Sequence, residues 1–318
     1  MRSIAGNSFR TAGGVAIFRR LTRGSLRILM YHRFGSRAGL ERQCAHIRAH
    51  YLPVSLSRVA EAMHGGAPLP DHAMAVTVDD GYRDFYDVAF PVFASYGIPA
   101  AVFVVTRFLD GGYWLWGDRV KYAFRNSPLS RVRIELPSGD ELGFLLADAP
   151  ARDHAATQLK ERAKLLPWRD CMSIVDSLPS ALRVDLPPRP EGEFAPMDWE
   201  QARRAAAGGM EVGAHTATHT ILSSLPNGEM LDSEIAGSRA RIEACLDRPV
   251  LHFCYPNGRL RDISGVLDRV RVAGFATAVT AEPGLNFPGA DPFLLRRIGV
   301  VTSYPDLYFN QRAAAFHL

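Results

Sequence analysis

The sequence has few cysteines and no long apolar run. It contains four cysteines, which form no CxxC pair and no zinc-knuckle spacing: Cys44, Cys171, Cys245 and Cys254. We expect small buried side chains there and no disulfide staple. No stretch approaches the roughly 18 apolar residues that a membrane span needs. The six residues from Gly13 to Phe18 are too few for the apolar region of a secretory signal, roughly 7–15 residues long. We therefore expect a cytoplasmic protein.

Lysine is nearly absent, and arginine supplies the positive charge. Only three of the 37 basic residues are lysines: Lys121, Lys160 and Lys164. Arginines crowd the first 48 residues, where Glu41 is the only acid. Such a basic head can contact nucleic acid, anionic lipid or an acidic polymer, or it can be a merely solvated terminus. The segment from Val15 to Leu26 fits a weakly amphipathic helix lying on a membrane surface.

Short apolar runs alternate with helical patterns along most of the chain. Predicted strands are Leu26–Tyr31, Ala73–Val78, Ala100–Val105, Met210–Val212, Val250–Cys254 and Ala276–Val279. This alternation predicts βαβ units and a largely parallel sheet. The pattern changes over residues 111–196, which we interpret as an inserted α+β segment. A length of 318 residues is compatible with two domains or with one elaborated barrel.

Two polar motifs follow predicted strands, where parallel sheets place their ligands. Asp79, Asp80 and Gly81 form the first, and paired carboxylates can divide the work between a metal ligand and a general base. Alone, this tripeptide is better explained by an ordinary turn or helix cap. His215 and His219 form the second, and histidines four apart face the same way on a helical turn. With one carboxylate they make a three-ligand site that leaves positions open for water.

The third element is the loop Tyr255-Pro256-Asn257-Gly258, which can present a backbone N–H to an oxyanion. In this order the three elements resemble the polysaccharide deacetylase family, the nodulation-type carbohydrate esterases that deacetylate N-acetylhexosamines. The first motif is matched by residues 77–81, with Val78 where the family usually has Phe, and the second by His215 to His219. The resemblance covers residues 26–108 and 196–300 and leaves the insertion unexplained.

By position, the resemblance implies roles for five residues of this chain. Asp80, His215 and His219 bind a divalent metal, Asp79 is the catalytic base, and the backbone N–H of Asn257 stabilises the oxyanion. The ion implied is zinc, with cobalt, nickel and iron as alternatives.

Two departures from the family pattern concern the remaining catalytic groups. Cys254 stands where the family has an Arg that holds the catalytic Asp, so Arg296 or Arg297 is the candidate replacement. The family's late histidine, in a Leu-x-His setting, is also missing. His32 ends the first predicted strand, which neighbours the last strand in a closed barrel. A subgroup of exopolysaccharide deacetylases is similar in beginning with this Tyr-His element, and we expect His32 to be the general acid; the alternative is a structural histidine beneath the site.

These elements predict an α/β protein with a distorted, seven-stranded (β/α) barrel over residues 26–318, preceded by a basic segment at 1–25. The expected function is metal-dependent N-deacetylation of amino sugars in a polysaccharide or glycan precursor, with exopolysaccharide biosynthesis as the setting. Hydrolysis of another non-peptide amide, or silent saccharide binding, stays open. We expect no nucleic-acid partner, and the oligomeric state stays open. The expected contact of the arginine-rich head is either the edge of the barrel or the inner face of a membrane. Candidate substrate contacts are Trp114, Trp116, Tyr255 and Arg297, although core packing explains the tryptophans equally well.

Overall fold

Seven parallel strands form a closed barrel. The computed structural model describes residues 13–226 and 228–316, so the predicted basic segment before residue 13 lies outside the described residues. The barrel closes because its first strand pairs with the last on one side and with β3 on the other. Around the barrel the strands run β1 (Arg27–Tyr31), β10 (Leu295–Gly299), β9 (Thr277–Pro283), β8 (His252–Cys254), β7 (Glu211–Ala214), β4 (Ala100–Val104) and β3 (Ala73–Val78). The predicted seven-stranded barrel is confirmed.

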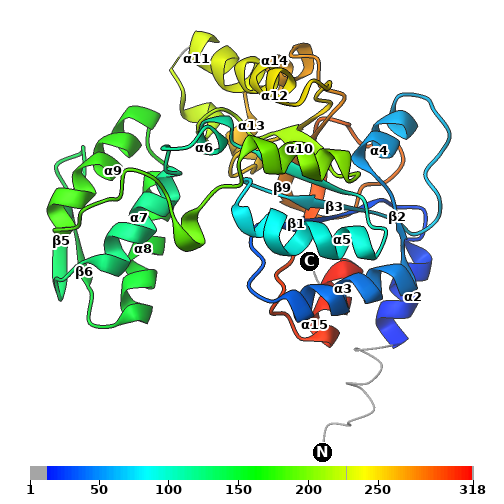
Figure 1. The fold of residues 1–318 in the computed structure, drawn as a ribbon, viewed down its shortest axis with the longest axis horizontal. Helices are drawn as coiled ribbons and strands as arrows, with labels where there is room; N and C mark the ends of the chain where they lie inside the picture. Colours follow the sequence, from blue (N-terminus) through cyan, green and yellow to red (C-terminus); the bar gives the residue numbers. More distant parts are fainter. Residues whose placement is uncertain (1–12, 227, 317–318) are drawn as a thin grey trace, which may run out of the picture.

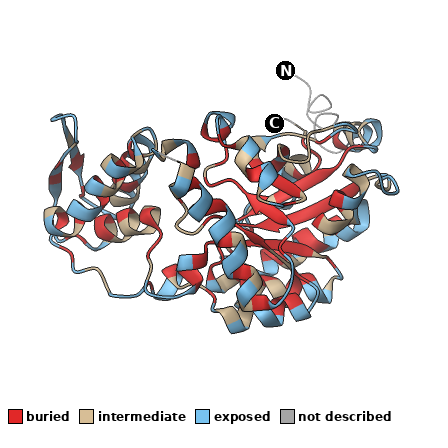
Figure 2. Ribbon diagram, turned by 90° about the horizontal axis from the view of Figure 1, so that it is seen from above, coloured by how far each residue is buried: buried red, intermediate tan, exposed pale blue. Residues whose placement is uncertain are grey.

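Most residues of the barrel strands are buried, because helices cover the outside of the barrel (Figures 1 and 2). All six residues of β3 are buried. The surrounding helices are α3 (Arg37–His50), α4 (Leu56–Met63), α5 (Phe90–Ser95), α6 (Thr106–Leu109), α10 (Trp199–Ala207), α11 (Gly228–Asp232), α12 (Ser238–Leu246), α13 (Leu260–Ile263), α14 (Leu267–Val272) and α15 (Asp306–Ala313). Two π-helical segments, Phe85–Ala89 and Ser233–Gly237, lead into α5 and α12, and the short β2 (Leu52–Pro53) pairs with the start of β3.

The inserted segment forms a second body beside the barrel (Figure 1). It contains α7 (Trp116–Asn126), the antiparallel pair β5 (Arg131–Glu135) and β6 (Glu141–Leu145), α8 (Ala149–Ala163) and α9 (Trp168–Leu182). Apolar side chains between positions 116 and 184 form a core of their own, distinct from the two clusters of the barrel.

A buried polar contact joins the insertion to the barrel next to β3. The hydroxyl of Tyr82 donates a hydrogen bond of 2.7 Å to Asp118 on α7, and the guanidinium of Arg33 lies 3.9 Å from the centre of the Tyr82 ring. Burial raises the pKa of Asp118 to about 6. This contact therefore joins the insertion to the barrel at Tyr82, three residues after Asp79.

One helix of the basic segment is described, α2 (Gly14–Leu21). Val15 is buried and the ring of Phe18 packs against Phe316, with 5.6 Å between ring centres. Ile17 and Leu21 are 51% and 79% exposed, so α2 keeps an apolar strip outside the fold. Among the described helices, none has the length and apolar character that crossing a bilayer requires.

Candidate active site

Strand alternation carries the predicted catalytic residues into the mouth of the barrel. Side chains two positions apart share one face of a strand. Ala73 and Ala75 of β3 and Ile28 of β1 belong to the cluster inside the barrel. The same alternation along each strand brings Asp79 and His32 to the carboxyl ends of that interior row. There the Nε2 atom of His32 lies 3.6 Å from Oδ2 of Asp79.

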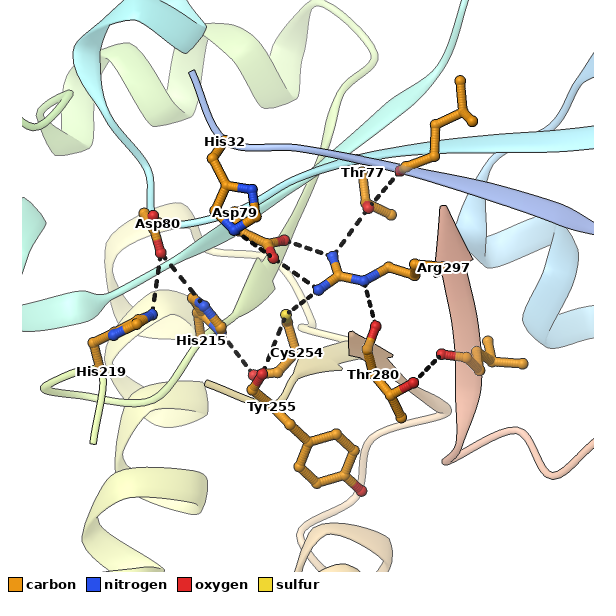
Figure 3. A network of polar contacts seen from close by, with 12 residues as sticks. His32, Thr77, Asp79, Asp80, His215, His219, Cys254, Tyr255, Thr280 and Arg297 are labelled. Atoms are coloured by element: carbon orange, nitrogen blue, oxygen red, sulfur yellow. Dashed lines mark hydrogen bonds and ion pairs between the residues drawn. The ribbon is translucent and has the colours of Figure 1, made fainter. Parts of the chain in front are cut away.

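Asp79 is held by a buried arginine from the last strand (Figure 3). Nη1 and Nη2 of Arg297 donate hydrogen bonds of 2.7 Å to the two oxygens of Asp79. Nη1 also reaches Thr77 at 3.1 Å, and Nε donates to the carbonyl of Thr280 at 2.6 Å. Burial alone would raise the pKa of Asp79, but the charge of Arg297, followed by that of His32, holds the pKa below its usual value. Asp79 is therefore an oriented, ionised carboxylate.

Arg297 also explains the cysteine at position 254. Its Nη2 atom lies 3.2 Å from Sγ of Cys254, and both side chains are buried. Burial raises the pKa of the Cys254 thiol well above its usual value. Arg297 thus supplies the basic partner expected from either Arg296 or Arg297, whereas the exposed Arg296 side chain donates to the carbonyl of Pro283.

A second carboxylate converges with the two histidines. Oδ1 of Asp80 lies 3.2 Å from Nε2 of His219 and 3.5 Å from Nε2 of His215. Oδ1 is buried and accepts no hydrogen bond from the described residues. Burial opposes ionisation of this carboxyl, but the two imidazoles hold its pKa well below the usual value. Asp80 adopts a φ of 77°, and Gly81, at 86°, would bring an added Cβ within 2.9 Å of Leu109.

The donor set fits a divalent metal. One atom from each of Asp80, His215 and His219 lies within 4.8 Å of the other two. Nδ1 of His215 is 2.7 Å from the carbonyl oxygen of Cys254, so it carries the proton and leaves the Nε2 lone pair facing Asp80. Asp79, His215 and Cys254 also lie close enough for a metal, but Asp79 is paired with Arg297 and the Cys254 thiol is protonated. The first set is therefore the candidate metal site.

The histidine motif is a loop, not the predicted helical turn. Residues 215–220 are not helical, and Thr216 and His219 adopt φ values of 65° and 61°. Glu234, a nearly buried carboxylate, accepts hydrogen bonds of 2.9 Å from the N–H groups of Ala217 and Thr218. These bonds hold the loop in place of helical hydrogen bonds. The two imidazoles converge as predicted, but a loop brings them together and not a helical turn. No pattern in the sequence pointed to Glu234.

The candidate catalytic residues line one cavity of about 210 Å³, together with Met30, Trp116, Lys164, Ile221, Tyr255, Asn257, Ala281 and Arg297. Asn257 adopts a φ of 59°, and its side chain donates a hydrogen bond of 2.6 Å to Asp262, which fixes the loop. Trp116 comes from the insertion, which therefore forms part of the wall. Trp114 lies elsewhere, where its indole N–H donates 2.9 Å to the carbonyl of Pro187 and its ring packs on Phe194.

A closed (β/α) barrel with an ionised carboxylate and a metal-type donor set at its mouth is typical of hydrolases. The polysaccharide deacetylase family model matches residues 66–128 and 184–277, on both sides of the insertion, and this chain belongs to that family. The chain is accordingly a hydrolase that acts on carbon–nitrogen bonds other than peptide bonds.

Known proteins resemble this chain in sequence or in fold. A poly-beta-1,6-N-acetyl-D-glucosamine N-deacetylase of Escherichia coli (strain K12) is 39% identical over 74 residues, which are 23% of this chain and 11% of that protein. The alignment thus spans about a tenth of the curated relative. The Streptococcus pyogenes deacetylase PplD superposes with a TM-score of 0.57 at 16% identity, covering 88% of this chain and 93% of that one. IcaB from Ammonifex degensii gives 0.57 at 19% identity, covering 92% and 97%. These two structures confirm the fold.

Proposed function

We propose that this protein is a metal-dependent hydrolase that removes N-acetyl groups from amino sugars of a polysaccharide or glycan precursor. The observation that carries the proposal is the placement of Asp79. Arg297 keeps this carboxylate ionised, and it lines the same cavity as the Asp80, His215 and His219 cluster. An ionised carboxylate that lies next to a metal-type donor set without belonging to it suits hydrolysis, and binding alone requires no such arrangement.

Asp80, His215 and His219 would hold the ion, and their mixed oxygen and nitrogen donors suit zinc, with cobalt, nickel or iron as alternatives. When bound, such an ion supplies Lewis-acid activation of the acetyl carbonyl and of water. The buried Oδ1 of Asp80, without a hydrogen bond from the described residues, supports this assignment.

The chain's own residues account for the proton transfers. Asp79 removes a proton from the attacking water as its oxygen bonds to the acetyl carbon, while Arg297 keeps both carboxylate oxygens oriented. The backbone N–H of Asn257 stabilises negative charge on the carbonyl oxygen. His32, on the cavity wall with 47% of its side chain exposed, gives a proton to the sugar nitrogen as the carbon–nitrogen bond breaks. The products are acetate and a free amine.

The shape of the site favours a glycan over a compact amide. Trp116 and Lys164 of the insertion form part of the wall of the catalytic cavity. A second, larger cleft of about 760 Å³ lies along α8 of the same insertion. A compact amide needs no such extension. Tyr255 and Trp116 line the cavity and are the candidates for stacking on a sugar face.

Acetate release tests the proposal. We expect purified protein to liberate acetate from N-acetylglucosamine oligomers, to lose that activity with a chelator and to regain it with added zinc. The Asp79→Asn variant, which keeps the shape of the side chain, controls for a contaminating deacetylase. Chelator-resistant release, or release by Asp79→Asn at the wild-type rate, contradicts the proposal.

We also propose a cytoplasmic location at the inner face of a membrane. The exposed Ile17 and Leu21 of α2 support it, because an apolar strip next to Arg19 and Arg20 suits an anionic lipid surface. Sedimentation with vesicles of phosphatidylglycerol and phosphatidylcholine tests this. Ile17→Ser and Leu21→Ser together should abolish sedimentation, and equal sedimentation of wild type and variant contradicts the proposal.

A further inference from the structure

The three lysines of this arginine-rich chain lie near one another in the insertion, and one of them, Lys164, lines the catalytic cavity. Lys121 is on α7, Lys160 is on α8, and Lys164 follows α8 directly. All three lie in the insertion, and Lys160 feels the charges of both Lys121 and Lys164. Lys164 also lines the cavity that contains His32 and Asp79. The insertion therefore brings positive charge to the catalytic centre.

The positive charge of Lys164 is not needed to balance a carboxylate of the catalytic centre. Asp79 and Arg297 neutralise each other through two hydrogen bonds of 2.7 Å. Asp80 converges with two histidines as a candidate metal ligand. Among the described residues, Lys164 forms an ion pair only with Glu161, at 2.7 Å. The side chain of Glu161 is 60% exposed, and exposed pairs of this kind contribute about 0–1 kcal/mol. A ligand anion can displace it.

Positive charge continues from the cavity into the larger cleft. Glu161, the partner of Lys164, lines the cleft of about 760 Å³ together with Arg162 and with Arg261 of α13. Arg261 belongs to the barrel and stands four residues after Asn257, which lines the catalytic cavity. The cleft therefore lies between insertion and barrel and adjoins the catalytic cavity through α8 and the Asn257 loop. Phe144 and Leu165 give it apolar surface.

We propose that Lys164 is a specificity-determining residue that binds an anionic group, a carboxylate or a phosphate, carried by the glycan near its N-acetyl group. Arg162 and Arg261 contact the continuation of the same glycan in the larger cleft. This inference rests on the proposed deacetylase function and names its substrate class as an acidic glycan. A neutral glycan offers a lysine only uncharged oxygen acceptors, in its hydroxyl, ether and amide groups, whereas an anionic group forms an ion pair in which donor and acceptor are both charged.

Competing substrates test the inference. Acetate release is measured on an N-acetylglucosamine tetramer, on a tetrasaccharide that alternates N-acetylglucosamine with glucuronic acid, and on an N-acetylglucosamine disaccharide 1-diphosphate. We expect kcat/KM to be higher on one of the two acidic substrates than on the neutral tetramer, and the preferred one identifies the source of the charge. Lys164→Met should reduce that preference about 10- to 100-fold, and Lys164→Arg should retain most of it.

Arg169→Met is the matched control, because it removes one positive charge from an exposed position on α9. It should keep the wild-type preference. Sodium chloride should raise KM for the preferred acidic substrate in the wild type more than in Lys164→Met. Equal kcat/KM on all three substrates, or an unchanged preference in Lys164→Met, overturns the inference. Release from none of the three substrates, in contrast, contradicts the proposed deacetylase function itself.

Discussion

Arg297 and Asp79 lie 218 positions apart in the chain and form a bidentate ion pair inside the barrel, with both side chains almost fully buried. β10 and β3 are the two neighbours of β1, so the closure of the barrel places these two residues together. The pair therefore connects the integrity of the fold with the ionisation of the proposed base.

Removing only the arginine should destabilise the protein strongly. Arg297→Met leaves the Asp79 carboxylate buried without its partner, which costs about 3–5 kcal/mol of unfolding free energy. Arg297→Met combined with Asp79→Asn removes the uncompensated charge and should recover most of that loss. Urea unfolding followed by circular dichroism measures both variants. If the double variant is no more stable than Arg297→Met, the pair does not have the energetic role inferred from its burial.

The contact between barrel and insertion should make stability depend on pH. The pKa of Asp118 is about 6 in the folded protein, against a usual value of 3.8. The folded state thus binds the proton more tightly, so this residue lowers the unfolding free energy as pH rises from 3.8 to 6. Over that range the loss is about 3 kcal/mol.

The measurement is urea unfolding of wild type and Asp118→Asn at several pH values between 4 and 7. The asparagine does not titrate and can still accept the hydrogen bond from Tyr82. The difference in unfolding free energy between variant and wild type should therefore grow in favour of the variant as pH rises. A difference that is constant with pH contradicts a raised Asp118 pKa.

The histidine loop should bind metal more weakly when Glu234 loses its charge. Glu234→Gln removes one acceptor from the carboxylate that binds the N–H groups of Ala217 and Thr218. Supporting groups of this kind typically change metal affinity about 10- to 100-fold. Competition with a chromogenic chelator measures the affinity, and the exposed Glu229→Gln in α11 is the control. Equal affinities in the two variants would show that Glu234 does not position the loop.

Much of this site follows from local sequence, and the missing parts depend on distant contacts. The buried run before Asp79 was predicted with the bounds of β3, because an unbroken apolar run is what a strand buried on both faces requires. β10 was not predicted, since Arg296 and Arg297 interrupt its apolar pattern and only the closed barrel shows that Arg297 points inward. Glu234 lies in a helical segment whose sequence does not reveal the loop it supports.

The amount of bound metal should depend on the predicted ligands and not on exposed histidines elsewhere in the protein. His219→Ala removes one of three converging donors, so we expect loss of the bound ion and of acetate release together. His154→Ala, at an exposed position in the insertion, is the matched control. Elemental analysis of the purified proteins gives the metal content. Full metal occupancy in His219→Ala would move the ion to another set of ligands.

The role of His32 can be separated from that of the metal ligands by the choice of leaving group. An amine must be protonated as the carbon–nitrogen bond breaks, whereas 4-nitrophenolate leaves without a proton. His32 faces Asp79 at 3.6 Å and remains half exposed, so His32→Ala should preserve metal content. Loss of a general acid lowers kcat about 10²- to 10⁴-fold. We expect that loss on N-acetylated sugars and a much smaller one on 4-nitrophenyl acetate. Equal losses on both substrates would assign His32 to orienting Asp79 or the substrate, because positioning affects an ester and an amide alike.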